Sequence, residues 1–392
     1  MPISDSQIEL VERKGKGHPD SLIDGACEAV SVALCKYYQD HYDLILHHNV
    51  DKGLLVGGKS SPIFGGGEVN DPIYVGVAGR AVSSISKGSK EETIPVTDIA
   101  LNAISDFLNS AVRFLNVDDH IILDSKIKQG SADLVSVYKD PGSIPLSNDT
   151  SFGVGFAPLT PTEKLVLDSE LYLNSDNLKS ELPEVGEDIK VMAYRKNEHV
   201  QLTIAAAGIS SLIPDADHYD SVISQVTSKI EDLASKSSEL DVSVHVNTGD
   251  LKSQGSYYLT VTGTSAEAGD DGNTGRGNRP TGLITPMREY SMEATAGKNP
   301  VSHTGKIFSV VAQSASERIA NEVKGVQEIY VRILSQIGSP INIPQTASAS
   351  VVLDQGVNLS NISSEIDSII HEELSDLDSV TNKILSGSVT LF

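Results

Sequence analysis

The sequence predicts an α+β protein made of three similar units, each a mostly antiparallel sheet covered by helices on one face. The prediction depends on a repeated pattern. Two helical segments occur with each group of two to four β-branched runs, and this combination recurs about three times along the 392 residues. The order lacks the regular strand–helix alternation of a doubly wound parallel sheet, and no G-x-G-x-x-G follows a predicted strand. We place the units at residues 1–120, 121–240 and 241–392, interleaved at their boundaries.

Apolar residues spaced three and four apart predict the helices. In the first helix these include Ile23, Ala26 and Val30. The third helix begins with a capping box, Thr160-Pro161-Thr162-Glu163, with proline at its first helical position. The predicted helices cover residues 19–38, 97–113, 161–176, 219–236, 302–323 and 359–373.

Alternating or β-branched runs between the helices predict the strands. They cover residues 44–48, 54–58, 73–78, 121–123, 189–194, 200–207, 242–246, 257–262, 327–334 and 348–353.

The composition limits the partners of the chain. A net charge of -23 and a pI near 4.7 argue against nucleic acid, because binding it requires clustered lysine and arginine. No apolar stretch approaches the ~20 residues that cross a membrane, and the start of the chain has no secretory signal. The two cysteines, Cys27 and Cys35, lie eight residues apart on a predicted helix, about 12 Å and too far for a disulfide. We expect a cytoplasmic protein.

The octapeptide GLLVGGKS, residues 53–60, matches the phosphate-loop pattern G-x-x-x-x-G-K-[ST]. In a phosphate loop a helix begins directly after the lysine and serine. Here Pro62 and the glycines of residues 65–67 follow, and neither favours a helix. Residues 54–56 read as the interior of a strand. We therefore expect any nucleotide phosphates to be held elsewhere.

The stretch GKGHPDSLIDG, residues 15–25, places His18 at the N-cap of the first helix, Pro19 at its first position and Asp20 next. One interpretation is structural, because an acid in the first turn offsets the helix dipole. The other is functional: the free N–H groups receive an anion, His18 donates to a phosphate oxygen, and Asp20 holds magnesium. The pattern alone leaves both open.

A second candidate is the long segment 266–300, which has scattered glycines and no clear period. Its glycines separate carboxylates from guanidiniums between Asp270 and Arg279, and Lys298 precedes the next helix. Together these residues supply the concentrated positive charge that an acidic chain needs to bind a polyphosphate. The apolar residues that could anchor the segment are Leu283, Ile284, Met287, Tyr290 and Met292. Residues 126–133 are a weaker candidate, for which a plain hairpin turn is the favoured interpretation.

Several longer motifs match a known family when they are taken together. They are Glu12 with Gly17-His18-Pro19-Asp20, Gly57-Gly58, FGGGE at 64–68, GDDG at 269–272, GRGNR at 275–279, GLITP at 282–286 and SMEATAGKNP at 291–300. This combination resembles the archaeal type of S-adenosylmethionine synthetase, also called methionine adenosyltransferase. The likeness covers most of the chain.

The resemblance implies three similar α+β domains in a pseudo-threefold arrangement and a homodimer with active sites at the interface. It also implies Mg²⁺-dependent use of ATP and L-methionine, in which the methionine sulfur attacks C5′ of ATP and the triphosphate is hydrolysed. Two alternatives stay open: another magnesium-ATP enzyme such as a small-molecule kinase, and a non-catalytic nucleotide sensor. A kinase would release ADP, whereas the expected products here are phosphate and pyrophosphate.

The resemblance also implies roles for single residues. His18, Arg276 and Lys298 resemble the groups that stabilise the departing triphosphate, and Asp20 and Asp271 are the candidate metal ligands. The expected substrate-binding residues are Glu12, Asp270, Gln129, Gly130, Ser131, Ala132, Asp133, Leu134, Arg279 and Lys306.

The chain departs from the bacterial branch of that family at three places. Gly277 follows Arg276 where bacterial relatives have a lysine, so Arg279 is expected to supply the second charge. Ser302 to Thr304 replace a further lysine and aspartate, which makes Lys306 the nearest base. Lys59 stands where a potassium-binding glutamate is usual. We therefore doubt a potassium requirement and suggest that the Lys59 ammonium replaces the ion, facing Asp271; a severalfold activation by potassium would contradict this.

Overall fold

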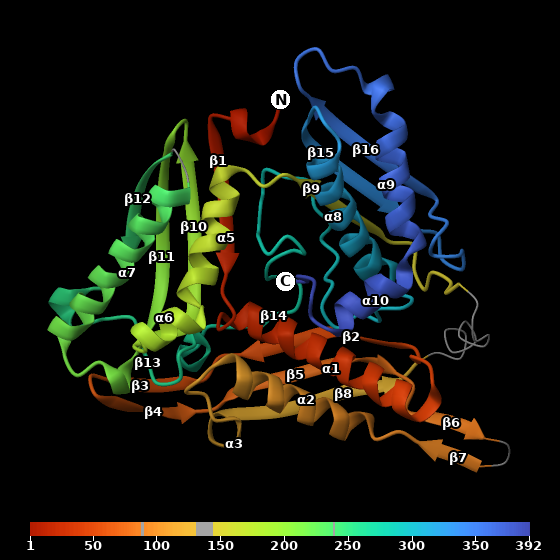
Figure 1. Ribbon diagram of the computed structural model, residues 1–392. Coiled ribbons are helices and arrows are strands. Elements are labelled where there is room, and N and C mark those ends of the chain that lie inside the picture. Colours follow the sequence, from red (N-terminus) through yellow and green to blue (C-terminus); the bar gives the residue numbers. More distant parts are fainter. Residues whose placement is uncertain (88–89, 131–143, 238–239) are drawn as a thin grey trace.

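The computed structural model describes residues 1–87, 90–130, 144–237 and 240–392. Within these residues the strands form three larger sheets and two short hairpins, and helices cover each larger sheet (Figure 1). The α+β class predicted from the sequence is confirmed. The hairpins are β3–β4 and β6–β7, with bounds Lys59–Ile63, Gly66–Asp71, Ser84–Lys87 and Lys90–Thr93.

The first sheet has the order β14-β2-β5-β8. Strand β5 is antiparallel to β2 and parallel to β8, and two long helices, α1 and α2, pack on one face. The elements are α1 (Pro19–Tyr42), β2 (His48–Val56), β5 (Ile73–Ala81), α2 (Val96–Ala111), α3 (Val117–His120), β8 (Ile121–Gln129) and β14 (Gly272–Asn273). Both cysteines are free and buried in this region, as expected of small core residues.

The second sheet has the order β1-β10-β11-β12, with β13 also paired to β11. Its first three strands are antiparallel, whereas β12 and β13 run parallel to β11. The elements are β1 (Ile8–Lys14), α5 (Pro161–Leu173), α6 (Asp176–Glu181), β10 (Val185–Lys196), β11 (His199–Ile209), α7 (Ala216–Ser237), β12 (Asp241–Val246) and β13 (Leu259–Thr260). The predicted capping box is present: Thr160 and Glu163 bond each other's backbone N–H groups at 3.0 and 2.8 Å.

The third sheet, β16-β15-β9, is antiparallel throughout, and α8 to α10 cover it (Figure 1). The elements are β9 (Phe152–Ala157), α8 (Thr304–Glu322), β15 (Val326–Leu334), β16 (Thr346–Leu353), α9 (Ser363–Ser375) and α10 (Leu377–Leu385). Short 3₁₀ helices complete the described elements: Ile3–Asp5, Ser210–Leu212, Lys252–Gln254, Ser265–Ala268 and Leu359–Asn361.

Each sheet takes a strand from a distant part of the sequence. Strand β1, near the start of the chain, pairs with β10; β9 pairs with β15; and β14 pairs with β2. The sheets therefore combine strands from separate parts of the chain. The division near residues 120 and 240 stays a prediction.

Several local predictions were wrong. Residues 44–47 are not a strand; β2 begins at His48 and runs unbroken to Val56, joining two runs that were separated in the prediction. Strands β1 and β9 and helix α10 were missed. Residues 126–129 continue strand β8 instead of forming a hairpin turn. Strands β1 and β9 were missed because pairing with a distant strand decides their conformation, and local pattern carries no information on it.

The phosphate-loop pattern was correctly rejected. Residues 54–56 end β2, and Lys59 begins a second strand, β3, instead of a helix. The Lys59 side chain is exposed, and the described residues include no ion pair between it and Asp271. The Asp271 carboxylate instead accepts the Gly57 N–H at 2.8 Å.

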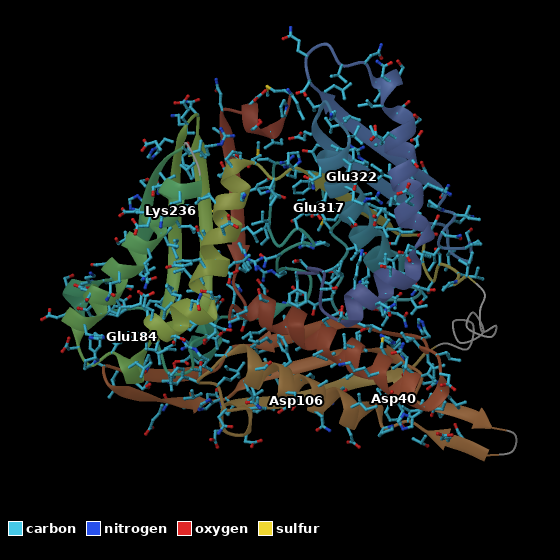
Figure 2. The ribbon with its side chains drawn as sticks, in the orientation of Figure 1. Asp40, Asp106, Glu184, Lys236, Glu317 and Glu322 are labelled. Carbon is cyan, nitrogen blue, oxygen red and sulfur yellow. The ribbon has the colours of Figure 1, made fainter. Side chains whose placement is uncertain are left out.

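The acidic character of the chain is distributed over its outer surface. Figure 2 shows Asp40, Asp106, Glu317 and Glu322 on α1, α2 and α8, and all four are exposed. Among the described residues, no helix is both long and apolar enough to span a bilayer.

His48, the first residue of β2, is completely buried. Its ring nitrogens lie 2.8 Å from the Ser31 hydroxyl and 3.1 Å from the Asn299 side-chain amide. Burial lowers the pKa of His48 to about 3. The imidazole is therefore neutral in the folded chain at neutral and mildly acidic pH.

The neutral His48 predicts a loss of stability in mild acid. Between pH 6.5 and 3 the unfolded chain protonates this ring and the folded chain does not, so the free energy of unfolding falls as the pH is lowered. Relative to His48→Gln, the natural chain should lose about 2 kcal/mol more between pH 8 and pH 5. Urea denaturation at both pH values measures this. Parallel losses in the two proteins would contradict it.

Candidate active site

A single irregular segment, residues 272–303, follows the free edge of β2. Gly272 pairs with Leu55, the Thr274 N–H bonds the Gly53 carbonyl at 3.2 Å, and farther along the Val50 N–H bonds the Gly297 carbonyl at 2.8 Å. The segment predicted as a long working loop is thus attached along the length of one strand. Leu283 anchors it in the core as expected, whereas Met292 is 83% exposed and anchors nothing.

The same segment contacts elements of the other two sheets. Glu12 on β1 exchanges backbone hydrogen bonds with Ile284, at 2.9 and 2.8 Å. The buried Arg288 bonds Glu163 at the start of α5 and Glu328 on β15, at 2.7 and 2.8 Å. The segment therefore connects all three sheets, and it can hold residues from each of them close together.

The start of α1 lies directly against this segment. His18 is the N-cap, and its Nδ1 accepts the Asp20 N–H at 3.1 Å. One carboxylate oxygen of Asp20 accepts the Asn273 N–H at 2.9 Å, and Asp24 accepts the Gly275 N–H at 2.8 Å. The two sharpest sequence candidates, 15–25 and 269–279, are thus neighbours in space.

His18 is buried, and this burial lowers the pKa of its imidazole. Asp188, Asp20 and Asp270 oppose the shift, while Lys14 adds to it. The ring is therefore neutral at pH 7. Because Nδ1 accepts a hydrogen bond, Nε2 carries the proton and is a donor for an anion at the helix start.

Positive charge gathers around these acids. The Lys14 ammonium lies 2.8 Å from Asp20 Oδ2, and Lys190 lies 3.3 Å from Glu12. Arg279 donates to the Gly275 carbonyl and lies over the Tyr290 ring, 5.6 Å from its centre. The Nε of Arg279 is buried with no hydrogen-bond partner in the described chain. The Arg276 side chain is exposed.

A second basic group surrounds Lys298, whose side chain is 2% exposed. Its ammonium pairs with Asp51 on β2, and with Glu293 at 2.8 Å. The fully buried Lys306 ammonium bonds both oxygens of Glu28, at 2.6 and 2.7 Å, and the Lys298 carbonyl at 2.9 Å. Of the predicted basic residues, Lys298 and Lys306 are therefore paired with acids of the chain itself.

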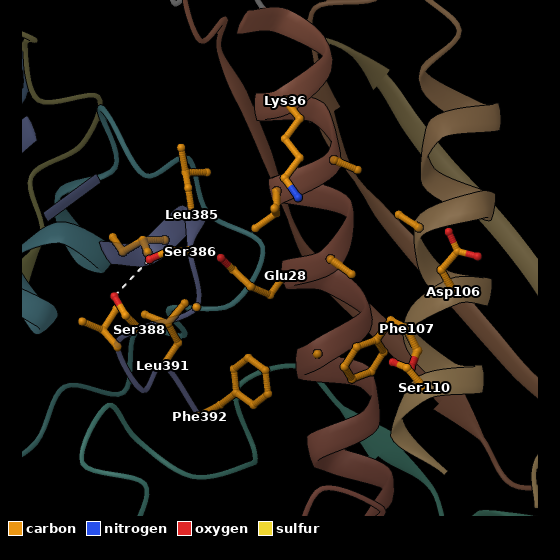
Figure 3. Close-up of a pocket in the computed structure, with 18 of the residues that line it drawn as sticks. Glu28, Lys36, Asp106, Phe107, Ser110, Leu385, Ser386, Ser388, Leu391 and Phe392 are labelled. Carbon is orange, nitrogen blue, oxygen red and sulfur yellow. Dashed lines mark hydrogen bonds between the residues drawn. The ribbon is translucent and has the colours of Figure 1, made fainter. Parts of the chain in front are cut away.

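Glu28 supports the Lys298 segment from behind. It accepts the Gly297 N–H at 2.8 Å in addition to the Lys306 ammonium. Figure 3 shows Glu28 on α1, pointing toward the segment that ends in Leu391 and Phe392. These elements, together with α2, enclose a cavity of about 740 Å³.

The two basic groups are separated along β2. Asn273 pairs with Leu54 and Lys298 pairs with Asn49, five strand residues away, or about 15–17 Å. A cavity of about 400 Å³ on the exposed face of the sheet spans this interval. Asp51, the partner of Lys298, and Asn273, the partner of Asp20, both line it.

Gln129, the first of the expected substrate-binding residues 129–134, lies at the Lys298 end of the sheet. Across the sheet, Gln129 lies opposite Ala81, which in turn lies opposite His48. His48 is next to Asn49, the residue that pairs with Lys298. The Gln129 side chain accepts from the Ser83 N–H and hydroxyl at 2.7 and 2.6 Å. Gly130 follows it, and Ser131, Ala132, Asp133 and Leu134 lie outside the described residues.

Sequence reasoning missed several charged residues that the fold brings into this region. They are Lys14, Glu28, Asp51, Asp188 and Glu293. Asp188 is buried, and burial raises the pKa of its carboxyl while His18 lowers it. Lys14 could have been found, because it lies four residues before His18. Glu28 could have been found as well, since it follows Asp24 by four residues on the same helix, and Glu293 lies within the motif at 291–300. Asp51 and Asp188 have no such local pattern.

Comparisons with known proteins agree with this architecture. The family described as "S-adenosylmethionine synthetase (AdoMet synthetase)" matches residues 1–388. The S-adenosylmethionine synthase of Hyperthermus butylicus is 51% identical over 397 residues, covering 100% of this chain and 97% of that protein. That of Pyrobaculum aerophilum is 52% identical over 394 residues, with coverage of 100% and 98%. The chain belongs to the S-adenosylmethionine synthetase family.

A solved structure supports the fold. "Structure of an Unusual S-adenosylmethionine synthetase from Campylobacter jejuni" superposes with a TM-score of 0.60 and covers 95% of this chain and 89% of that one. The sequence identity is 15%, so this likeness concerns the architecture alone.

Asp20 at the start of α1 and Asp271 directly before β14 suit a hard divalent cation in part. Carboxylate oxygens are the ligands that Mg²⁺ prefers, and Mg²⁺ is usually held by one or two carboxylates together with substrate phosphates. Asp20 and Asp271 offer such oxygens. The described residues contain no group of three or more acids, histidines or cysteines that could form an all-protein cage. The donor set fits a cation that arrives with a phosphate ligand.

The buried Glu28–Lys306 pair predicts a specific stability pattern. Lys306→Met leaves the Glu28 carboxylate buried without its cation, which should lower the free energy of unfolding by about 3–5 kcal/mol. Adding Glu28→Gln removes that unpaired charge and should recover a large part of the loss. Urea denaturation of the two variants measures both effects.

Arg318→Met is the matched control, because Arg318 pairs at the protein surface with Glu322 on α8 and Glu372 on α9, and its loss should cost under about 1 kcal/mol. If Lys306→Met were no worse than this control, the pair would not be holding the Lys298 segment.

Proposed function

We propose that this chain forms S-adenosylmethionine from ATP and L-methionine. The observation that carries the proposal is the full-length family match, combined with His18 and Asp20 packed against the segment of Asp270 to Arg279. The enzyme is then a methionine adenosyltransferase. The methionine sulfur attacks C5′ of ATP and forms the S–C bond, while the C5′–O bond breaks and the triphosphate departs. Hydrolysis of the triphosphate to phosphate and pyrophosphate follows.

The residues of this chain fit the charge changes of that reaction. A thioether sulfur has no proton to lose, so the first step requires alignment and stabilisation of the leaving group instead of a general base. The neutral His18 can donate its Nε2 proton in a hydrogen bond to the departing oxygen anion. Arg276, Arg279 and Lys298 are the proposed cations for the polyphosphate. Glu12 and Asp270 are the proposed acids beside the sulfonium product.

Magnesium, when bound, would neutralise phosphate charge. Asp20 is the proposed ligand, with Asp271 as the second candidate. Lys306 is satisfied by Glu28 and the Lys298 carbonyl, so we assign its effect on substrate to the position of Lys298. The exposed Lys59 leaves a potassium requirement doubtful, and the cytoplasmic location expected from the sequence stays a prediction.

One assay tests the activity. Purified protein incubated with ATP, methionine and Mg²⁺ should release the sulfonium product, phosphate and pyrophosphate in equal amounts, detected by mass spectrometry and phosphate assays. ADP as the product would favour a kinase, and tight ATP binding without turnover would favour a sensor.

His18→Ala and Lys298→Ala should each lower kcat by about 10²–10³-fold, because each removes a charge or proton donor from a preorganised site. Far-UV circular dichroism should remain unchanged. The control variants His199→Ala and Lys252→Ala remove exposed residues paired with Asp241 and Asp220, and their kcat should stay within twofold. A site variant within threefold of the natural enzyme would lose its catalytic assignment.

We also propose a homodimer that forms through the uncovered face of the first sheet. Helices cover the opposite face, yet this one exposes Leu54, Val56 and Ile122, at 43%, 41% and 52%. The 400 Å³ cavity opens on the same face, so a second copy would close it. This would exclude water from the interval between the two basic groups.

Charge placed on this face should dissociate the dimer. Leu54→Asp combined with Ile122→Asp puts two carboxylates into the proposed contact, and light scattering should then give half the mass of the natural protein. Leu171→Asp, at an equally exposed leucine on α5, is the control and should remain dimeric. An unchanged mass in the double variant would exclude this face as the interface.

A further inference from the structure

Lys14 is the last residue of β1, and its side chain lies between residues of the proposed site. Its ammonium lies 2.8 Å from Asp20 Oδ2, 2.9 Å from the Arg276 carbonyl and 3.9 Å from Glu12, and its side chain is only 11% exposed. No other lysine of the described chain makes an ion pair with Asp20.

The backbone of Lys14 is fixed by Asn278, whereas its ammonium makes its contacts at the end of a flexible side chain. Its N–H bonds the Asn278 side-chain oxygen at 2.9 Å, and its carbonyl accepts from the Asn278 amide at 2.8 Å. The ammonium, by contrast, is at the end of four flexible methylene groups and is held by two contacts within the site. It can therefore change partner without movement of β1.

The ammonium and a divalent cation would compete for the same acid. Asp20 Oδ1 accepts the Asn273 N–H, a backbone group. Asp20 Oδ2 bonds the Lys14 ammonium, which can move away and leave this oxygen to a cation. Two positive charges within about 4 Å of each other repel strongly in a partly buried site. A cation bound at Asp20 therefore weakens the ion pair between Lys14 and Asp20.

We propose that Lys14 is an exchangeable counter-ion of the active site. It pairs with Asp20 while the site is empty, and it transfers to an oxygen of the bound polyphosphate when a divalent cation takes Asp20. This inference rests on the proposed function. Lys190 does not share the role, because its nearest acid is Glu12, at 3.3 Å, and its side chain is 41% exposed.

The exchange gives each charge a partner in both states. In the empty site the buried Asp20 carboxylate is neutralised, which avoids the cost of an isolated buried charge. In the loaded site the ammonium becomes a donor for the leaving group, where negative charge develops. One lysine would thus protect the empty site and stabilise the reacting one.

Removal of Lys14 should have opposite effects on metal binding and on turnover. The probe is Mn²⁺ without nucleotide, whose free concentration is measured by electron paramagnetic resonance. Lys14→Met should bind Mn²⁺ about three- to tenfold more tightly than the natural protein, because the competing ammonium is gone. Its kcat for S-adenosylmethionine formation should fall about 10²-fold.

Lys16→Met is the matched control, since Lys16 lies two residues later with an exposed side chain. Its Mn²⁺ affinity and kcat should stay within twofold. Lys14→Arg keeps the charge and should restore the natural Mn²⁺ affinity, which separates loss of charge from loss of fold.

Unchanged or weaker Mn²⁺ binding by Lys14→Met would overturn the proposal, and so would a kcat within threefold of the natural enzyme. If the natural protein bound Mn²⁺ but formed no S-adenosylmethionine, the proposed function would fail. The Mn²⁺ comparison would then still decide whether Lys14 competes for Asp20.

Discussion

The hydrogen bonding of residues 272–298 along the edge of β2 is the constraint on which the candidate site depends. A strand edge has a fixed spacing of about 3.3 Å per residue, so a segment bonded to it at two places has its side chains fixed in register. Asn273 is placed opposite Leu54, beside the start of α1, and Lys298 opposite Asn49. The side chains of this irregular segment are thereby positioned as accurately as those of a strand.

Close approach of the backbone makes this attachment possible. At Gly272 a side chain would lie 2.4 Å from the Pro19 carbonyl oxygen, and at Gly297, where φ is +77°, it would lie 2.5 Å from the Val50 carbonyl oxygen. Only glycine permits both contacts. The segment can lie this close to the start of α1 and to β2 because glycine has no Cβ atom at these two positions.

The charges of the protein divide between its surface and its site. Acids on the outer helices give the chain its net charge of -23, whereas the cations of the site are paired internally: Lys14 with Asp20, Lys298 with Asp51 and Lys306 with Glu28. Buried pairs of this kind add little net stability but fix geometry. A polyanion entering the site would find positive charge already positioned, which reduces the reorganisation needed at the moment of reaction.

The sequence by itself determined the α+β class, most helices, the N-cap role of His18 and the rejection of the phosphate loop, because periodicity, capping residues and proline act within a few residues. It also identified 269–279 and Lys298 as unusual. Only the tertiary structure decided that β1 and β9 are strands, that β2 is continuous, and that Asp51 and Asp188 belong to the site. Those features depend on pairings between residues up to 247 positions apart, such as Asp51 with Lys298, and no local pattern encodes such a contact.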